Sequence, residues 1–259
     1  RSIIKKDGIK INFSTGSYIA PIASFLSFTS GIQYFGQEQN IYAGLGNKIT
    51  SLLPAVIFTS YPHTKNIYKK KTIYVGPVVN KDIINFKNIK NRGALTIGVQ
   101  GGSQGSEEIN NYMYKFLSTK KITNINFLHI TGKEKSINNL NIENYKQFEF
   151  IENMNEYYEK INFQISRSGG GALEAAFLGI PQILIPFKHG TTASHQHLNA
   201  KYLSTLGAAI IVNSYNEFEK NLVDIINNYE VNQKVKPNKI NIQIGNSEIT
   251  KYLKEAFNE

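Results

Sequence analysis

The segment from residue 95 to residue 110, "LTIGVQGGSQGSEEIN", places glycines between a short apolar run and a helix-like stretch. Gly101, Gly102 and Gly105 allow positive φ and close approach of the backbone to a ligand, and Ser103 can donate its hydroxyl. In open α/β sheets, ligands bind where strands end and helices present free N–H groups. The pattern favours a diphosphate site, and a ligand-free turn between strand and helix is the alternative.

A second glycine segment, residues 163–190, carries a carboxylate inside an apolar helix pattern. We expect Gly169–Gly171 to form the turn, a helix to begin near Ala172, and Glu174 to lie in its first turn. One interpretation is that the helix dipole favours the carboxylate, by about 0.3–1 kcal/mol. The other is that Glu174 accepts hydrogen bonds from the vicinal hydroxyls of a ribose. The presence of two glycine turns in consecutive strand–helix units favours the ribose.

Neither glycine segment has the spacing of the dinucleotide-binding G-x-G-x-x-G motif or of the phosphate-binding G-x-x-x-x-G-K-[ST] loop, which disfavours a dehydrogenase and a nucleoside triphosphatase. Downstream, residues 186–200 contain His195, Gln196 and His197. Residues two apart on a helix point about 200° away from each other, so the two histidines cannot share a metal ion, and we predict no metal site. The amide of Gln196 both donates and accepts, which suits sugar hydroxyls.

These side chains need strands and helices to position them. Apolar runs rich in Ile and Val predict ten strands, at Ile9–Ser14, Ile32–Phe35, Ala55–Thr59, Thr72–Val75, Leu95–Val99, Asn126–Ile130, Gln147–Phe150, Asn162–Ser166, Gln182–Ile185 and Ala208–Val212. Helical spacing unites Ile109, Met113, Phe116 and Leu117 after the first glycine segment. A second set, Leu198 to Leu206, follows Ser194, which we expect as its N-cap. Alternating strands and helices predict a doubly wound α/β fold with parallel sheets.

Bulk composition is that of a globular protein: 259 residues, 41% hydrophobic and 19% charged, with no cysteine. The absence of cysteine excludes disulfides and thiolate metal sites and fits a reducing cytoplasm. The net charge of +10 indicates either an anionic partner or a compositional bias towards Lys, Asn and Ile. The lysines are scattered, so no nucleic-acid partner is predicted. No apolar run reaches the roughly 18–20 residues of a spanning helix.

The polar segment 76–92, which opens with Gly-Pro, is the best domain boundary. It separates a first block of about half the size of a doubly wound domain from a larger second block. Because residue 1 is Arg rather than Met, we expect that the true start of the gene product lies upstream or has been removed.

The quoted segments together resemble a known family. "GGSQGS" at 101–106, "RSGGGALEAAFLGIPQILIPF" at 167–187 and "HQHLNA" at 195–200 are similar to the donor-binding half of the MurG family of glycosyltransferases. Residues 14–49 are similar to that family's second glycine loop and its H-E-Q-N stretch, and residues 74–82 to its interdomain segment. The likeness extends over about 200 residues in the family's order.

The resemblance implies a GT-B fold of two Rossmann-like doubly wound domains, the first only partly present. Residues 1–77 would be the remnant of the N-terminal acceptor-binding domain, 78–92 the interdomain linker, and 93–245 the C-terminal domain that binds the uridine diphosphate sugar. Residues 246–259 would be a helix that returns to the N-terminal domain.

The resemblance also implies site residues for UDP-N-acetylglucosamine. Gly101, Gly102, Ser103 and Gly105 would hold the diphosphate. Ile151 would meet uracil through its backbone, Ala172 and Leu173 would line the nucleotide, and Glu174 would hold the ribose. Gln196 would bind the sugar hydroxyls, and Asn40 would reach the donor from the N-terminal domain.

Two departures from the family concern catalysis. The family's first glycine loop, G-G-T-G-G-H, has no counterpart in this sequence, and Gln37 replaces the histidine of H-E-Q-N. Glu38 is the carboxylate that remains as a candidate general base, with a structural role as the alternative. The loop after Arg167 is also one residue shorter before Glu174 than in the family.

The implied reaction is inverting transfer of N-acetylglucosamine from UDP-N-acetylglucosamine to undecaprenyl-diphospho-muramoyl-pentapeptide, a step of peptidoglycan synthesis that serves cell-wall biogenesis, cell shape and cell division. The implied partners are this sugar nucleotide, the lipid-linked muramoyl-pentapeptide and an anionic membrane surface. No cofactor is expected. The implied location is peripheral, on the cytoplasmic face of the bacterial cell membrane. The alternatives are another GT-B enzyme, either a glycolipid transferase or an epimerase of nucleotide sugars, and an inactive chain that binds a nucleotide sugar.

Overall fold

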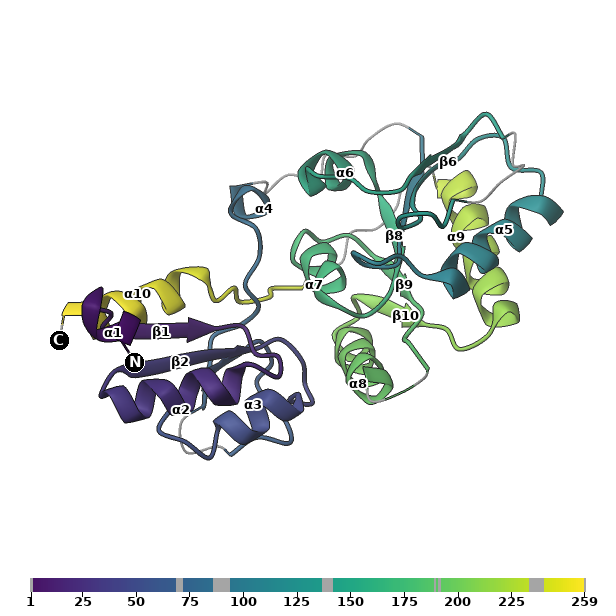
Figure 1. Cartoon of the computed structure of the whole chain (residues 1–259). Coiled ribbons are helices and arrows are strands. Elements are labelled where there is room, and N and C mark those ends of the chain that lie inside the picture. Colours follow the sequence, from purple (N-terminus) through teal and green to yellow (C-terminus); the bar gives the residue numbers. More distant parts are fainter. Residues whose placement is uncertain are drawn as a thin grey trace. The chain divides into compact units, whose positions relative to one another are not determined.

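The computed structural model describes residues 2–68, 72–85, 94–136, 142–188, 190, 192–232 and 240–258. It divides into two compact units, Arg1–Val79 with Ile242–Glu259, and Asn80–Asn241 (Figure 1). The predicted linker, 78–92, begins at the first division, and its residues 86–92 lie outside the described residues. The predicted second domain ended at residue 245, four residues beyond the second unit's last residue, Asn241.

The first unit contains one parallel sheet in the order β1-β2-β3-β4. Its strands are β1 (Ile11–Ser14), β2 (Gln33–Glu38), β3 (Val56–Thr59) and β4 (Thr72–Tyr74), and its helices are α1 (Ser2–Lys6), α2 (Ala20–Ser30), α3 (Leu45–Thr50) and α10 (Asn246–Asn258). Proline in the first turn of α2 and Gly31 at its end, with φ 71°, set the bounds of that helix.

Helices α2 and α10 cover opposite faces of this sheet (Figure 1). Ile249 of α10 is buried with Phe35 and Phe58, whose rings stack 5.8 Å apart. On the other face, Asn12 of β1 donates to the Ser27 hydroxyl of α2 over 3.0 Å. The chain therefore returns at its C-terminal end to complete the core of the first unit.

The second unit contains a parallel sheet in the order β10-β9-β8-β5-β6-β7. Its strands are β5 (Thr96–Gln100), β6 (Asn126–Ile130), β7 (Tyr145–Phe148), β8 (Phe163–Ser166), β9 (Gln182–Leu184) and β10 (Ala209–Ile211), and its helices are α4 (Lys81–Asn85), α5 (Glu107–Thr119), α6 (Met154–Lys160), α7 (Gly170–Phe177), α8 (Thr192–Thr205) and α9 (Tyr215–Asn232). All ten predicted strands are present in the two sheets, with bounds shifted by a few residues. The predicted doubly wound α/β class is confirmed.

Helices cover both faces of the second sheet (Figure 1). On one face, α5 and α9 bury a large apolar cluster, and the predicted face of α5, from Ile109 to Leu117, lies in it. On the other face, α6 and α7 bury Tyr157, Tyr158 and Ala175. Helix α8 begins at Thr192, so the prediction of Ser194 as its N-cap is wrong. No helix among the described residues is both long enough and apolar enough to cross a membrane.

Candidate functional site

The two glycine segments meet at the point where the order of the second sheet reverses. From β5 the sheet continues to β6 and β7 on one side, and from β8 it continues to β9 and β10 on the other. Strands β5 and β8 pair directly, with Gln100 in register with Ser166, so the loops after both strands leave the same edge side by side. We expected consecutive strand–helix units, and the chain instead inserts β6 and β7 between them. Such a switch point is where open α/β sheets bind ligands.

The loop after β5 is a tight turn that packs against the loop after β6. Gly105 donates its N–H to the Gly102 carbonyl over 3.0 Å, and both residues have positive φ, 68° and 83°. A Cβ on Gly105 would lie 2.1 Å from the Thr131 carbonyl oxygen, so only glycine fits there. Ser103 is exposed at the tip of the turn. The turn leads to the N-terminus of α5, where Ser106 caps the helix by accepting from the Ile109 N–H.

The loop after β8 differs from the prediction. Helix α7 begins at Gly170 with the extended Gly169 as its N-cap, so Gly170 and Gly171 are helical and Glu174 is the fifth residue of the helix. The placement of Glu174 in the first turn was wrong, and the helix dipole does not account for the carboxylate, because the dipole acts within the first turn. Glycine at 171 serves close packing instead, since a Cβ there would lie 2.9 Å from the Gln100 Nε2.

Glu174 is half-buried, and its Oε2 accepts a hydrogen bond from the Tyr158 hydroxyl over 2.9 Å. Burial raises the pKa of the Glu174 carboxyl, and the bond from Tyr158 opposes this rise only in part. Within the described part of the chain, no donor reaches the Glu174 Oε1. The carboxylate therefore has one oxygen held by the protein and one that can accept from a ligand.

Two of the other predicted contacts of the nucleotide are buried, and the third is half-buried. Ala172 and Leu173 are 0% and 4% exposed. Ile151, in the loop after β7, packs against the cluster of Tyr157 and Tyr158. Ala172 and Leu173 therefore offer almost no surface to a ligand in this structure, whereas Ile151 is half-buried, and the roles of all three residues stay predictions.

Gln196 lies in α8 and is partly committed to the protein. Its Oε1 accepts from the Phe187 N–H over 3.0 Å, and its main-chain oxygen accepts from the Ser168 hydroxyl over 2.6 Å. These bonds tie α8 to the segments that follow β8 and β9. They leave the side-chain NH₂ as the group that could bind a sugar hydroxyl.

A charged cluster that the sequence analysis missed lies beside these loops. Glu108, in the first turn of α5, accepts from Arg167 over 2.8 Å and from Lys188 over 2.6 Å. Burial alone would raise the pKa of Glu108, but the bonds from Lys188 and Arg167 outweigh it and lower that pKa. The cluster joins α5 to the ends of β8 and β9. The three residues are far apart in sequence, and no spacing indicates that they pair.

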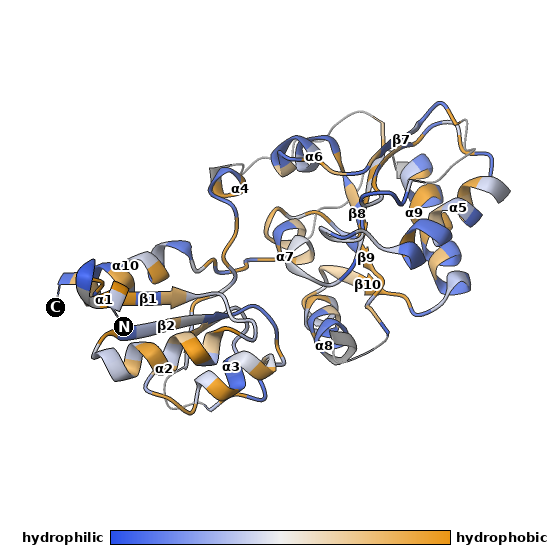
Figure 2. Ribbon diagram, viewed as in Figure 1, coloured by the Kyte–Doolittle hydropathy of each residue, from blue (hydrophilic) through white to orange (hydrophobic). Residues whose placement is uncertain are grey.

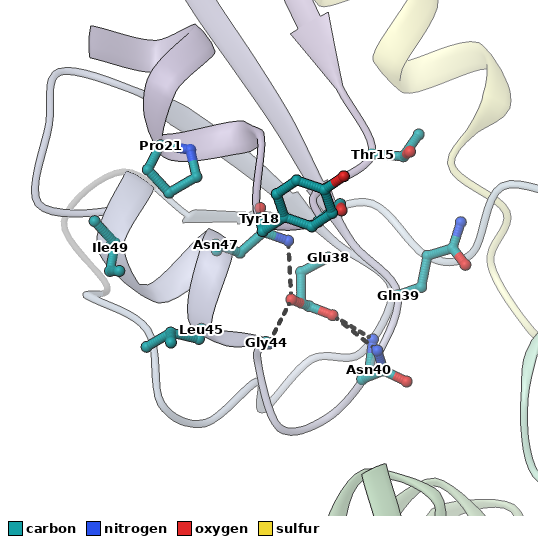
Figure 3. Close-up of a pocket in the computed structure, with 12 residues that line it drawn as sticks. Thr15, Tyr18, Pro21, Glu38, Gln39, Asn40, Gly44, Leu45, Asn47 and Ile49 are labelled. Carbon is teal, nitrogen blue, oxygen red and sulfur yellow. Dashed lines mark hydrogen bonds between the residues drawn. The ribbon is translucent and has the colours of Figure 1, made fainter. Parts of the chain in front are cut away.

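The first unit contains its own pocket, of about 410 Å³, beside Glu38 (Figure 3). The Glu38 Oε1 accepts from the Asn40 N–H and side chain at 2.9 and 3.1 Å. Its Oε2 accepts from the Gly44 N–H at 3.0 Å and from the Asn47 side chain at 2.9 Å. With two donors on each oxygen, Glu38 fixes the loop that forms one wall of the pocket. Its role as general base stays a prediction, as does the donor contact of Asn40.

Two features of this pocket also escaped the sequence analysis. The exposed ring of Tyr18 lies beside Asn47 and Pro21 at the pocket (Figure 3). Ser17 has φ 73°, and a Cβ on Gly46 would lie 2.0 Å from the Ser17 carbonyl oxygen. Close backbone packing and an uncommon conformation therefore shape the pocket.

Comparisons with known proteins match most of the second unit and the first part of α10 to a described domain. The sequence profile of the glycosyltransferase family 28 C-terminal domain matches residues 96–253. Two relatives bear the name UDP-N-acetylglucosamine–N-acetylmuramyl-(pentapeptide) pyrophosphoryl-undecaprenol N-acetylglucosamine transferase. The protein from Bacillus cereus is 29% identical over 82% of this chain, and that from Thermosipho melanesiensis is 31% identical over 83%. The chain spans 62% and 63% of their lengths.

Solved structures share the fold. MurG of Acinetobacter baumannii has a TM-score of 0.72 and 20% identity, with 98% of this chain and 76% of that chain covered. The UDP-GlcNAc 2-epimerase from Neisseria meningitidis, bound to UDP-GlcNAc, has a TM-score of 0.69 and 16% identity, with 98% and 78% covered. These similarities concern the fold, and they confirm the predicted GT-B class.

Proposed function

Because the chain belongs to glycosyltransferase family 28, as its resemblance to the MurG family predicted, we propose that it transfers N-acetylglucosamine from UDP-N-acetylglucosamine to undecaprenyl-diphospho-muramoyl-pentapeptide. The reaction inverts the anomeric carbon: the acceptor hydroxyl attacks and uridine diphosphate leaves. The product would serve peptidoglycan synthesis.

The observation that carries this proposal is the pair of glycine segments at the switch point of the second sheet. The turn at 101–105 presents an exposed Ser103 and main chain without side-chain cover ahead of the α5 N-terminus. Negative charge grows on the diphosphate as it leaves, and N–H groups fixed in advance stabilise such charge. This electrostatic contribution is the main catalytic role of the second unit in the proposed reaction.

Two side chains are available to bind the ribose and the sugar of the donor. Glu174 has an oxygen available for the ribose hydroxyls, and Gln196 has an NH₂ group available for the sugar. In the proposed complex Ile151 meets uracil through its main chain, and Ala172 and Leu173 line the nucleotide. Arg167 and Lys188 share a single carboxylate, that of Glu108, so the cluster keeps a net positive charge. In the proposed reaction this charge balances the negative charge of the diphosphate.

The pocket of the first unit suits the acceptor. Glu38 holds its wall through Asn40, Gly44 and Asn47. In the proposed reaction one of these bonds opens, and the Glu38 carboxylate then takes the proton of the acceptor hydroxyl.

Exposed apolar residues line this pocket and continue along α2 and α3. The ribbons of both helices contain segments coloured as hydrophobic (Figure 2). Tyr18, Leu45 and Ile49 both line the pocket and belong to a larger exposed set, which we call the apolar face: Tyr18, Ile19, Ile22, Phe25, Phe28, Leu45, Ile49 and Leu52. An exposed apolar surface of this extent marks an interaction site. Because the proposed acceptor carries a lipid, we infer that the apolar face rests on the membrane. The net charge of +10 favours anionic lipid. The protein then works as a peripheral enzyme on the cytoplasmic face of the cell membrane.

Sedimentation with vesicles of phosphatidylglycerol tests this surface. Phe25→Glu replaces a half-exposed ring of the apolar face with a charge and should weaken binding about tenfold or more, because burying such a side chain contributes about 1.5–3 kcal/mol. Val231→Glu, at a position 82% exposed in the second unit, is the matched control and should bind as the wild type does. Equal binding by the two variants would exclude the apolar face from membrane contact.

A transfer assay tests the reaction itself. The chain is incubated with radiolabelled UDP-N-acetylglucosamine and the lipid-linked muramoyl-pentapeptide, and labelled lipid is measured beside the nucleotide products. Label in the lipid supports the proposal, and Glu38→Gln should reduce its rate. Conversion to UDP-N-acetylmannosamine would instead favour an epimerase, which the similarity to the Neisseria meningitidis fold keeps as the second candidate. If the chain binds the nucleotide but forms no product, the conclusion is that it is an inactive protein that binds a nucleotide sugar.

A further inference from the structure

Three glutamines interrupt the buried strands of the second sheet. Gln100, Gln164 and Gln182 are 7%, 0% and 1% exposed, on β5, β8 and β9. Strands of a parallel sheet covered on both faces are normally apolar throughout. Burying an amide costs free energy unless its donors and acceptor find partners. A role for these three residues therefore has to come from the partners that they bind.

The three amides bond to one another across the strands. The Gln100 Nε2 donates to the Gln164 Oε1 over 2.9 Å, and the Gln164 Nε2 approaches the Gln182 Oε1 at 3.2 Å. Gln164 and Gln182 are in register on neighbouring strands, which makes their contact a direct consequence of the pairing. We call Gln100, Gln164 and Gln182 the glutamine ladder.

The glutamine ladder ends on the first turn of α7. The Gln182 Nε2 donates to the Ala172 carbonyl over 2.9 Å, and the Gln164 Nε2 approaches the Gly171 carbonyl at 3.2 Å. A Cβ at Gly171 would lie 2.9 Å from the Gln100 Nε2, so the absence of a side chain there lets the helix approach the glutamine ladder. The sheet thus holds the start of α7 by polar bonds that have a fixed direction, where apolar packing would allow the helix to rotate or slide.

Tyr158 connects this arrangement with Glu174. Its hydroxyl donates to the Glu174 Oε2 over 2.9 Å, lies 3.3 Å from the Gly171 carbonyl oxygen and receives the Gln100 amide at 3.4 Å. The ring is fully buried beside Tyr157, so the hydroxyl has little freedom to move. One carboxylate oxygen of Glu174 is therefore fixed from inside the protein.

We propose that Tyr158 and the glutamine ladder are positioning residues that aim the Glu174 carboxylate at the ribose of the sugar nucleotide. The inference rests on the proposed function, in which Glu174 binds the ribose. A glutamate side chain has several rotatable bonds and loses entropy when a ligand fixes it. Here the bond from Tyr158 already fixes the Glu174 side chain in the free protein, so less entropy is lost when the ligand binds. The Glu174 Oε1 is the oxygen that then accepts from the ligand.

Titration calorimetry with uridine diphosphate and its 2′-deoxy analogue tests the proposal, because the two differ by one ribose hydroxyl. The wild type should prefer uridine diphosphate, and Glu174→Ala should lose that preference. Tyr158→Phe should reduce the preference about three- to tenfold, the usual range for one hydrogen bond, while the affinity for the deoxy analogue changes less than about twofold. Gln182→Met should act in the same direction.

Two controls separate positioning from general damage. Tyr112→Phe also removes a hydroxyl bonded to a glutamate, Glu108, in the same unit, and should keep the preference. In the Glu174→Ala background, Tyr158→Phe should have no further effect on the preference, since it acts through Glu174.

Different results would refute the proposed function and the positioning role of Tyr158. A wild type that does not bind uridine diphosphate refutes the proposed function, and this inference falls with it. If Glu174→Ala removes the preference but the folded Tyr158→Phe variant keeps it in full, the positioning role alone is refuted. Should Tyr158→Phe weaken both nucleotides equally, its role is structural and the inference is again overturned.

Discussion

Replacing Glu174 with alanine should weaken binding of uridine diphosphate about 10- to 150-fold. The variant loses a carboxylate that accepts from the ribose, and a hydrogen bond to a charged group contributes about 1.5–3 kcal/mol, where every 1.4 kcal/mol is tenfold in affinity. The Tyr158 hydroxyl already occupies the Glu174 Oε2, so the structure allows one strong ribose bond, through Oε1, and the lower part of this range is expected.

The Glu174→Gln variant tests the role of this carboxylate by a second quantity, the stability of the protein as a function of pH. Burial raises the pKa of the Glu174 carboxyl, so this group favours the folded state most below its unfolded pKa and loses that contribution as the pH rises through the folded pKa. At pH 7, which lies above the ordinary value of 4.5, the raised pKa of this carboxyl should therefore cost stability. Glu174→Gln should be more stable than the wild type at pH 7, by up to about 1 kcal/mol, with no gain below pH 4. It should still bind the nucleotide more weakly.

Titration calorimetry at pH 7 and thermal unfolding at both pH values measure these effects. Glu159→Ala, an exposed glutamate on α6, is the control and should change neither affinity nor stability appreciably. In the wild type, affinity for uridine diphosphate should fall as the pH drops through the raised pKa of Glu174. Unchanged affinity in Glu174→Ala would remove this residue from the site and refute the assignment of the ribose contact.

Further predictions concern other parts of the structure. Gln196→Ala should weaken UDP-N-acetylglucosamine more than uridine diphosphate, measured by calorimetry, and equal losses would exclude a sugar contact. Gly46→Ala should destabilise the protein by about 2 kcal/mol or more, because its Cβ would lie 2.0 Å from the Ser17 carbonyl oxygen, whereas Gly44→Ala has open space and should be tolerated; denaturant unfolding compares them. Glu108→Gln should cost about 1–3 kcal/mol at pH 7 and progressively less as the pH falls below 4.5, the ordinary pKa of this carboxyl. The lowered pKa of Glu108 means that its contribution exists above the unfolded pKa and is lost as the pH falls, and a cost independent of pH would contradict this.

The strands could be predicted from sequence because each is a short apolar run with its own local pattern. The meeting of the two glycine segments could not. It depends on β8 pairing with β5 after β6 and β7 have been added on the far side, and such non-local pairing leaves no trace in spacing. The sequence indicated that both segments bind the same ligand, but it misjudged them as consecutive units.

The error at α7 has a local cause. Three successive glycines were interpreted as a turn, since glycine is the usual residue of turns. The structure uses glycine at 171 because Gln100 lies against the helix there, and the chain is already helical at Gly170. The start of α7 is set by packing against a strand about 70 residues earlier in the sequence. Rules that use only neighbouring residues therefore cannot predict it.

The glutamine ladder did leave a signal. A glutamine in the middle of "FQIS", within an otherwise apolar buried strand, is a polar residue that needs partners. The sequence shows that such partners must exist, and only the register of β8 with β9 shows that one of them is Gln182. The pairing of Glu108 with Arg167 and Lys188 had no comparable signal.

The most direct measurement is the crystal structure of the protein soaked with uridine diphosphate. The account predicts density for the diphosphate over the turn at 101–105, ahead of the α5 N-terminus, with the ribose hydroxyls within hydrogen-bond distance of the Glu174 Oε1. Nucleotide bound away from the edge where β5 and β8 end, or no bound nucleotide at saturating concentration, would contradict it.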